Sequence, residues 1–350
     1  GIGGPEDRAA RKAAAASEPA WAGAGAQLGV QIWRIEQFKV VPCDHKQFGK
    51  FHKGDSYIIL ETYREEGSAK LLHHIYFWLG ESTSVDEMGT AAYKTVELDD
   101  YLGGEPTQSR EVMGQESLQF KALFPRLTYL DGGVETGFHH TGSVPYMPRL
   151  LHIRKTRHGV VKKEVTLSRE SLNQGDCFVL DAGTLIYVWI GSEANGVEKY
   201  EANLLVDHLK LERHGRASKA RCDDEFWRLL GGPGPIKSAS EASDEIPEPE
   251  IGEGVLYRML STGGELRLEE VGRQDIHPSQ LDSGHVMILD HTSELCVWVG
   301  KGAPDLESRN ALSTAARFLA MNGRDRGIPI HVYKEGTPIA NPLWGDVFRD

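Results

Sequence analysis

Three stretches of the chain share one pattern of apolar and polar positions. Each starts with a glycine and a polar residue, and an apolar run follows: 54–60 (GDSYIIL), 175–181 (GDCFVLD) and 284–290 (GHVMILD). A second apolar run then ends in Trp, an aliphatic residue and Gly: 77–80, 187–191 and 296–300. Trp78, Trp189 and Trp298 are 111 and 109 residues apart. Such runs predict strands, and their recurrence at this distance predicts three domain-sized repeats.

Each repeat also contains an opening strand and a helical pattern. The opening strands are expected at 30–41, 149–161 and 254–262. Apolar positions recur at spacings of three and four in the second repeat (Val197, Tyr200, Leu204, His208, Leu211) and in the third (Leu312, Ala315, Leu319). This period places the residues on one face of a helix. Each repeat therefore predicts strands covered by a long helix, an α+β fold.

Two linkers separate the repeats. The segment 141–148 contains two prolines, and 231–254 is rich in Gly, Pro, Ser and Glu. Both compositions are typical of extended or mobile segments. The expected organisation is a flexible arm at 1–26, domains at 27–140, 149–230 and 254–350, a linker at 141–148 and a flexible acidic linker at 231–253.

Composition and charge exclude several classes of protein. A net charge of −12 argues against general nucleic-acid binding, which needs a basic face. The four cysteines lie far apart, which favours reduced thiols in an intracellular protein over a disulfide framework or a zinc cluster. No apolar run reaches the length of a membrane span, and no secretory signal is present. Neither HExxH nor GxSxG occurs, so enzyme activity has no positive support.

The Gly-Asp pairs at the strand starts are candidate calcium sites. Asp55 and Asp176 offer carboxylates beside a glycine carbonyl, and these are the hard oxygen ligands that calcium prefers. The helix that follows offers a second carboxylate in each repeat: Glu87, Glu198 and Glu307. A turn and first-turn helix acids would explain a single copy, but the recurrence favours an ion site. His285 replaces the aspartate in the third repeat, which predicts a weak or empty calcium site there.

Together with further segments, these motifs resemble one known family. The segments are LGVQIWRIEQF (28–38), VELDDYL (96–102), FPRLTYLDGGVETGF (124–138) and YVWIGSEAN (187–195). Over residues 27–350 the chain resembles the gelsolin/villin family, and with three repeats it is most similar to the severin/fragmin branch. The resemblance implies three domains of α+β fold, each a central mixed β-sheet sandwiched by a long and a short helix.

The resemblance implies Ca²⁺ as the cofactor and assigns its ligands. One ion would be held by Gly54, Asp55, Glu87 and the backbone of Val134, and another by Gly175, Asp176 and Glu198. A further ion would be shared with actin through Asp99, Gly104 and Pro106. In the third domain only Gly284 and Glu307 remain of the ligand set, so calcium binding there is doubtful.

A helix predicted at 86–102 carries the expected actin contact. Met88, Ala92 and Val96 form one stripe, and Tyr93 lies beyond it. From the pattern alone, one stripe would be buried in the core and the rest solvated. The resemblance implies that the outer face binds actin through Met88, Ala92, Tyr93 and Val96, with Tyr93 as an aromatic anchor.

A basic segment follows the first linker and contains no acidic residue between 146 and 163. Its cations are Arg149, Arg154, Lys155, Arg157, Lys162 and Lys163. They could simply protect a solvated strand edge from mispairing. The alternative is a contact with the filament side and with phosphoinositides, because clustered Lys and Arg attract anionic head groups.

The function implied by the resemblance is calcium-activated severing of actin filaments with capping of their barbed ends, and with possible nucleation. Such a protein is not an enzyme; it binds monomeric and filamentous actin, is a monomer when free, and belongs to the cytoplasm and cytoskeleton. Three alternatives stay open. They are capping or monomer binding without severing, a phosphoinositide-binding adaptor at a membrane surface, and, ranked last, an unrecognised hydrolase.

Overall fold

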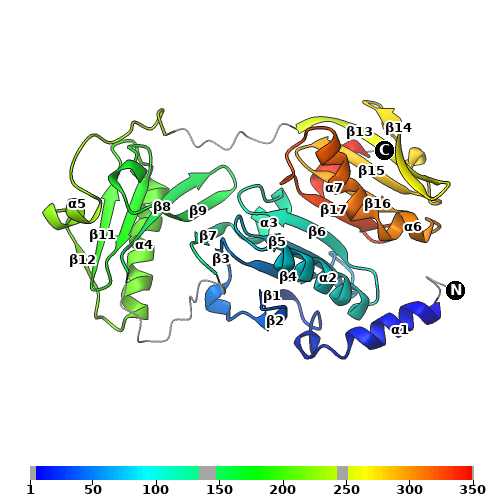
Figure 1. The fold of residues 1–350 in the computed structure, drawn as a ribbon, viewed down its shortest axis with the longest axis horizontal. Helices are drawn as coiled ribbons and strands as arrows, with labels where there is room; N and C mark the ends of the chain where they lie inside the picture. The colour runs from blue at the N-terminus through cyan, green and yellow to red at the C-terminus, as the bar shows by residue number, and fades with distance from the viewer. Residues whose placement is uncertain (1–4, 134–146, 243–250, 349–350) are drawn as a thin grey trace. The chain divides into compact units, whose positions relative to one another are not determined.

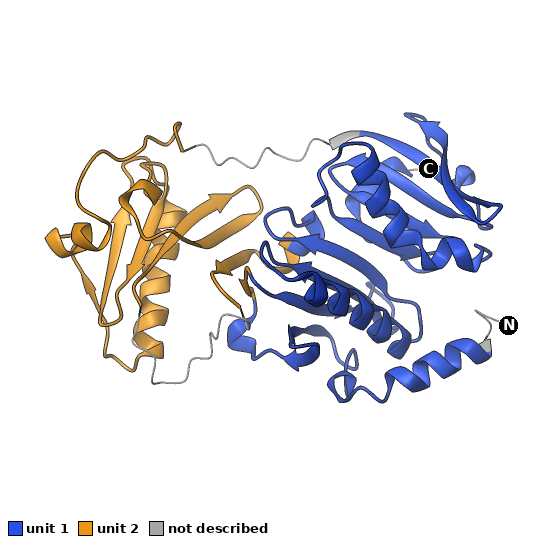
Figure 2. Ribbon diagram, viewed as in Figure 1, with its two compact units in different colours: residues 1–48, 54–120, 247–350 blue, residues 49–53, 121–246 orange. Residues whose placement is uncertain are grey.

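The computed structural model describes residues 5–133, 147–242 and 251–348 (Figure 1). The chain divides into two compact units (Figure 2). Unit 1 comprises residues 1–48, 54–120 and 247–350, and unit 2 comprises residues 49–53 and 121–246. The third repeat and most of the first therefore lie in unit 1, whereas residues 49–53 and the end of the first repeat from residue 121 onward join the second repeat in unit 2.

Unit 1 is built on one ten-stranded sheet. Its order is β14-β13-β15-β16-β17-β6-β5-β4-β1-β2. The strands of the first repeat are β1 (Gly29–Glu36), β2 (Lys39–Pro42), β4 (Ser56–Tyr63), β5 (Leu72–Leu79) and β6 (Thr107–Val112). Those of the third are β13 (Ile251–Thr262), β14 (Glu265–Arg273), β15 (Val286–Thr292), β16 (Leu295–Val299) and β17 (Ile330–Lys334). Parallel pairs, β5 with β6 and β16 with β17, make this a mixed sheet.

The two repeats of unit 1 join where β6 pairs with β17 in antiparallel orientation. A chain of buried polar side chains crosses this seam. His74 Nε2 lies 2.6 Å from Ser109 Oγ, which lies 2.5 Å from His331 Nδ1, and His331 Nε2 lies 2.5 Å from Glu294. Although burial opposes it, the hydrogen bond to Glu294 raises the pKa of His331. The seam is thus fixed by specific polar contacts as well as by the ladder.

Helices cover both faces of this sheet. The helices of unit 1 are α1 (Pro5–Ala15), η1 (Pro19–Trp21), η2 (His45–Gln47), α2 (Val85–Tyr101), η5 (Pro278–Gln280), α6 (Asp305–Arg309), α7 (Ala311–Met321) and α8 (Pro342–Val347), and α3 (Leu118–Leu123) begins here. Helix α2 packs on β4 and β5, and α7 packs on β16 and β17. In the third repeat Trp344 of α8 joins a second core cluster with Trp298 and Tyr333. This arrangement confirms a mixed sheet between a long and a short helix.

Unit 2 is a seven-stranded mixed sheet in the order β12-β11-β10-β8-β9-β7-β3. Its strands are β3 (Lys50–His52), β7 (Arg126–Leu130), β8 (Arg149–Thr156), β9 (Gly159–Val165), β10 (Cys177–Asp181), β11 (Leu185–Ile190) and β12 (Ser218–Ala220), and its helices are η4 (Arg169–Ser171), α4 (Gly196–Glu212) and α5 (Asp224–Leu229). Ala202, Val206 and Leu209 of α4 pack in one cluster, and Phe226 of α5 packs in another. The α+β prediction is confirmed.

Two details differ from the predicted pattern. The expected opening strands of the first and second repeats are hairpins, β1–β2 and β8–β9. The first of these turns at Gln37 and Phe38, whose φ values of 47° and 67° are unusual for residues other than glycine. No glycine therefore marks this turn in the sequence. In α4, the predicted stripe is not the buried face: Tyr200 is 61% and Leu211 is 74% exposed.

Candidate functional site

One backbone contact recurs in all three repeats and joins the two sequence markers. The glycine after the Trp strand donates its N–H to the carbonyl of the residue that follows the strand-start glycine: Gly80 to Asp55 (3.0 Å), Gly191 to Asp176 (2.9 Å) and Gly300 to His285 (3.1 Å). A Cβ at Gly191 would clash with the carbonyl of Gln174, and a Cβ at Gly300 with that of Ser283. The close approach therefore requires glycine at these positions.

In the second repeat this contact brings two predicted calcium ligands together. Asp176 and Glu198 share a side-chain hydrogen bond, and His152 Nε2 lies 2.7 Å from Asp176. Glu198 is 2% exposed and is the third residue of a helix that Asn195 caps in a capping box. Burial and the hydrogen bond to Asp176 raise the pKa of Glu198 to about 7. Against the effect of burial, hydrogen bonds from His152 and Glu198 lower the pKa of Asp176.

This geometry suits a calcium ion. Two carboxyl groups in contact disfavour a second negative charge, so the proton that the raised pKa keeps on Glu198 is shared with Asp176 through their hydrogen bond. A divalent cation that replaced this proton would find hard oxygen donors on a rigid strand start and helix start. Asp176, Glu198 and the strand-start glycine Gly175 are thus the residues that would hold Ca²⁺.

The first repeat buries the corresponding pair. Asp55 is 0% and Glu87 is 5% exposed. Arg34 lies 3.8 Å from Asp55, and Thr83 connects Ser56 (2.8 Å) with Glu87 (3.5 Å). The predicted fourth ligand, Val134, lies outside the described residues. Both predicted acids are thus buried, and Asp55 lies beside Arg34.

In the third repeat a histidine occupies the aspartate position and contacts the helix acid directly. His285 Nδ1 lies 2.9 Å from Glu307 Oε1, and Glu307 is completely buried. The strand-start glycine Gly284 donates its backbone N–H to the carboxylate of Asp282 (2.9 Å). Within the described residues, no group of three or more His, Cys, Asp or Glu side chains is arranged to hold a metal. Any ion site here must use backbone or water oxygens as well.

The predicted ligands of the shared ion surround the C-terminal end of α2. Asp99 is 4% exposed, and its Oδ2 lies 2.5 Å from Nζ of Lys334, a residue of the third repeat. Gln108 also donates to this carboxylate. Gly104 donates its N–H to the backbone carbonyl of Asp99 (2.9 Å), and Pro106 is buried. The three predicted residues therefore lie together, and a lysine neutralises the carboxylate.

Helix α2 buries one stripe of residues and leaves another exposed. Its buried residues include Ala91, Thr95 and Leu98. Tyr93 is 66% and Val96 is 49% exposed, whereas Met88 and Ala92 are half-buried beside them. The outer face named by the sequence is therefore available to a partner at Tyr93 and Val96.

The predicted basic segment forms the β8–β9 hairpin, and the fold divides its cations into two groups. Arg149 lies 3.3 Å from Asp181, and Lys162 is buried 3.4 Å from Glu201. Burial lowers the pKa of Lys162. The exposed cations of the hairpin are Lys155, Arg157 and Lys163, and Arg154 is half-buried. Acids that are distant in sequence thus pair with two of the cations, so the free positive charge of this segment is smaller than the sequence predicts.

Two ion pairs at the far ends of β10 and β15, the strands that follow the strand-start glycines, were not predicted from the sequence. Asp181 accepts two hydrogen bonds from Arg213 (both 2.6 Å), and Asp290 is paired with Arg324 (2.6 and 3.1 Å). Each arginine follows the long helix of its repeat. The signal was present, because both strand runs end in Leu-Asp.

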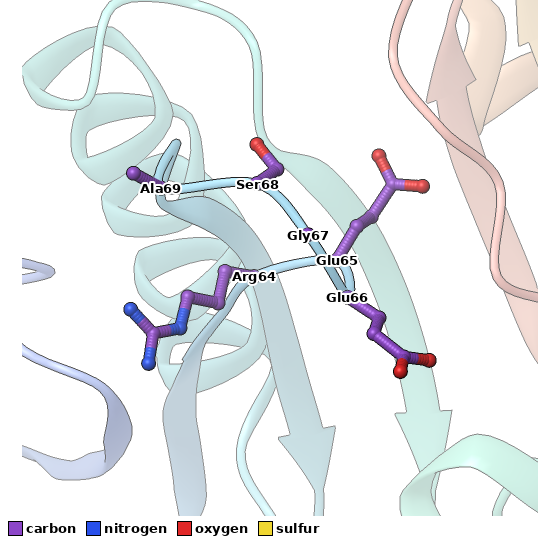
Figure 3. A pocket seen from close by; sticks show the side chains of 6 residues that line it. All are labelled: Arg64, Glu65, Glu66, Gly67, Ser68 and Ala69. Carbon is purple, nitrogen blue, oxygen red and sulfur yellow. The ribbon is translucent and has the colours of Figure 1, made fainter.

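A hollow of the surface lies at the hairpin loop between β4 and β5. Arg64, Glu65, Glu66, Gly67, Ser68 and Ala69 line it. Figure 3 shows the Arg64 side chain pointing away from those of Glu65 and Glu66. Since its charged groups do not converge, this loop offers no site. Among the described residues, no helix has the length and apolar character needed to cross a bilayer.

Comparison with known proteins places this geometry in context. A family model described as Gelsolin repeat matches residues 35–121, 158–226 and 268–342. Gelsolin-like protein 1 of Lumbricus terrestris is 38% identical, over 96% of this chain and 91% of that protein. Actin depolymerising venom protein gelsolin 1 of Platymeris rhadamanthus is 39% identical, over 86% and 83%. Severin of Echinococcus granulosus is 34% identical, over 91% and 87%.

Proposed function

The chain belongs to the gelsolin family, and from this premise we propose that it severs actin filaments and caps their barbed ends under the control of calcium. One observation carries the proposal: Lys334 of the third repeat neutralises Asp99 of the first. Asp99 is the residue expected to share an ion with actin. A lysine and a calcium ion therefore compete for one carboxylate, and the lysine must leave before the shared site can form.

The seam between β6 and β17 is the element that would open. It contains three paired positions, whereas the β5–β6 ladder contains six and the β16–β17 ladder five. A ligand shifts such an equilibrium only by binding one state more tightly than the other. Calcium at Asp99 meets this condition, because it binds the state in which Lys334 has left. Calcium at Asp55 and Glu87, and at Asp176 and Glu198, would add to the shift.

The outer face of α2 would then contact actin. Tyr93 and Val96 place an aromatic and a branched aliphatic side chain in solvent next to Asp99. Such residues are common anchors of interfaces. The work of severing would come from binding energy alone, with no covalent step, and we expect the protein in the cytoplasm with the actin cytoskeleton. The names of the relatives, an actin depolymerising protein and a severin, support this assignment.

The second repeat would bind the filament side. The support is the set of exposed cations on the β8–β9 hairpin, Lys155, Arg157 and Lys163. The same cations could attract phosphoinositide head groups, which makes regulation at a membrane surface the second candidate. In this proposal the domains are 27–140, 149–230 and 254–350, and the first binds the barbed end. Without the filament contact, the protein would cap but not sever.

Depolymerisation of pyrene-labelled actin filaments tests the proposal. We expect calcium to increase the number of filament ends with the wild-type protein. Lys334→Ala should lower the calcium concentration required, by roughly 5- to 150-fold, the usual range of coupling between sites. Lys301→Ala removes an exposed lysine of the same repeat and serves as the control. The absence of any calcium-dependent rise in filament ends would exclude severing, and an unchanged threshold in Lys334→Ala would exclude the lysine as the inhibitory group.

A further inference from the structure

The third repeat retains an acid that is buried more deeply than a turn or a helix start requires. Glu307 is 0% exposed, and one of its oxygens, Oε2, is buried with no hydrogen-bond partner among the described residues. Its other oxygen lies 2.9 Å from His285 Nδ1. A buried carboxylate oxygen without a partner costs free energy. This arrangement indicates that the site serves something besides the stability of the repeat.

The charges around this pair differ from those of the other two repeats. Arg34 and His152 occupy equivalent positions, opposite Tyr57 and Phe178 in the first and second repeats, and each lies near the strand-start aspartate. The equivalent residue of the third repeat, Arg258, lies 3.7 Å from Asp282. The cation of the opening strand is therefore directed to an acid outside the pair, and His285 is the group that faces Glu307.

We propose that the third repeat binds a late first-row divalent cation of the Zn²⁺ type, and not Ca²⁺, through His285 Nδ1 and the carboxylate of Glu307. Imidazole nitrogen is a preferred ligand of Zn²⁺, whereas Ca²⁺ takes oxygen ligands. The exchange of Asp for His thus changes the class of metal that the position selects. A carboxylate and a neutral imidazole leave one negative charge at the site, which suits a divalent ion completed by water.

The distance between the two ligand atoms lets one cation bridge them after a small movement. Two atoms about 2.1 Å from a tetrahedral Zn²⁺ lie ~3.4 Å apart. The observed separation is 2.9 Å, so the two side chains must move apart by about 0.5 Å to admit the ion. His285 is 28% exposed, so water can complete the coordination shell from the open side. With two protein ligands the site is weaker than a structural zinc site, which has four.

Titration of the full-length protein with ZnCl₂ in saturating calcium tests the proposal, because calcium fills the sites of the other repeats first. Calorimetry should give one zinc equivalent more for the wild type than for His285→Gln or Glu307→Gln. His208→Gln removes an exposed histidine of α4 and should keep the wild-type stoichiometry. This control separates the site from zinc bound by other histidines.

Equal zinc stoichiometry in the wild type and His285→Gln would overturn the proposal and leave the pair as a simple hydrogen bond. Glu307→Gln alters a buried group and could disturb folding, so His285→Gln is sufficient for the decision. Its fold is checked by circular dichroism and by an unchanged number of calcium equivalents. Since no actin is present, the outcome is independent of the severing activity.

Discussion

The strand starts of the second and third repeats present different side chains on the same backbone. In the second, Asp176 contacts Glu198 and His152. In the third, His285 contacts Glu307. Yet the backbone hydrogen bond from the Trp-Gly strand to the residue after the strand-start glycine measures 2.9 Å in one and 3.1 Å in the other. The glycines therefore serve the fold, and the two repeats differ in the side chain that meets the helix acid, Asp176 in one and His285 in the other.

At the far ends of β10 and β15 the two repeats carry the same pair of side chains, an aspartate and an arginine. The burial of this pair differs between the repeats. Arg213 forms an ion pair with Asp181, whose side chain is 0% exposed. Arg324 forms an ion pair with Asp290, whose side chain is 11% exposed. The same pair is thus more deeply buried in the second repeat. Burial increases the penalty for leaving one charge without its partner.

Removing each arginine gives the largest expected difference between the repeats. Loss of one member of a buried ion pair costs about 3–5 kcal/mol. We expect Arg213→Ala to lower the free energy of unfolding of the second repeat by about 3 kcal/mol, near the low end because Arg149 stays close to Asp181. Arg324→Ala should cost the third repeat less. Amide hydrogen exchange of β10 and β15 reports each effect locally.

A surface pair provides the control for this experiment. Arg228 and Glu225 are 70% and 45% exposed, and such pairs contribute only about 0–1 kcal/mol. Arg228→Ala should therefore leave exchange in β10 nearly unchanged. Equal losses for Arg213→Ala and Arg324→Ala would show that the depth of burial does not distinguish the two repeats.

Exchanging the strand-start residues should exchange the response to calcium. A ligand at 100 times its dissociation constant stabilises the fold that binds it by about 2.7 kcal/mol. We expect Asp176→His to remove this stabilisation from the second repeat and His285→Asp to create it in the third. Thermal unfolding with and without calcium, with hydrogen exchange to locate the change, measures both. If His285→Asp gains no calcium response, then other features of the third repeat, and not His285, exclude the ion.

The repeats and the positions of their strand starts were predictable because local geometry enforces their markers. A glycine such as Gly191 is needed wherever two strands approach too closely for a Cβ, so it recurs at a fixed place in each repeat. The contact between Lys334 and Asp99 was not predictable, because 235 residues separate them and only the β6–β17 seam brings them together. The pairing of Lys162 with Glu201 escaped prediction for the same reason.

Calcium binding by the second repeat should depend on pH. This dependence should distinguish it from a third repeat that carries the substitution His285→Asp. Burial and the hydrogen bond to Asp176 raise the pKa of Glu198 to about 7. Calcium must displace this proton, so its apparent affinity for the second repeat should fall by up to about tenfold per pH unit below pH 7. In the absence of calcium the sign reverses. The raised pKa means that the folded state holds the proton more tightly, so stability falls as the pH rises from about 4.5 to 7.

Calorimetry of the wild type and Glu198→Gln at pH 6 and pH 7 measures this dependence. The glutamine has no proton to release at this position, so the calcium that remains bound should show a smaller change with pH. A second-repeat affinity that is constant from pH 6 to pH 7 would contradict the shared proton. Proton release on calcium binding, measured in buffers of different ionisation enthalpy, gives an independent check.

The smallest expected difference concerns how the two helices begin. Asn195 caps α4 with its side chain, while Pro304 stands at the start of α6 and makes no side-chain cap. Loss of an N-cap side chain costs about 1 kcal/mol. Asn195→Ala should therefore weaken the second repeat by about this amount and also calcium binding, because Glu198 hydrogen-bonds to the backbone N–H of Asn195 (3.1 Å) and both groups lie in one turn.

Asn203→Ala is the matched control, since Asn203 lies on α4 beyond the first turn and its side chain contacts Lys199 and Lys219. Asn203→Ala should lower the stability of the second repeat and its calcium affinity by less than Asn195→Ala does. A loss of stability in Asn195→Ala with unchanged calcium affinity would mean that the cap holds the helix but not the position of Glu198. The cap, which the third repeat lacks, would then not contribute to the difference in ion binding between the two repeats.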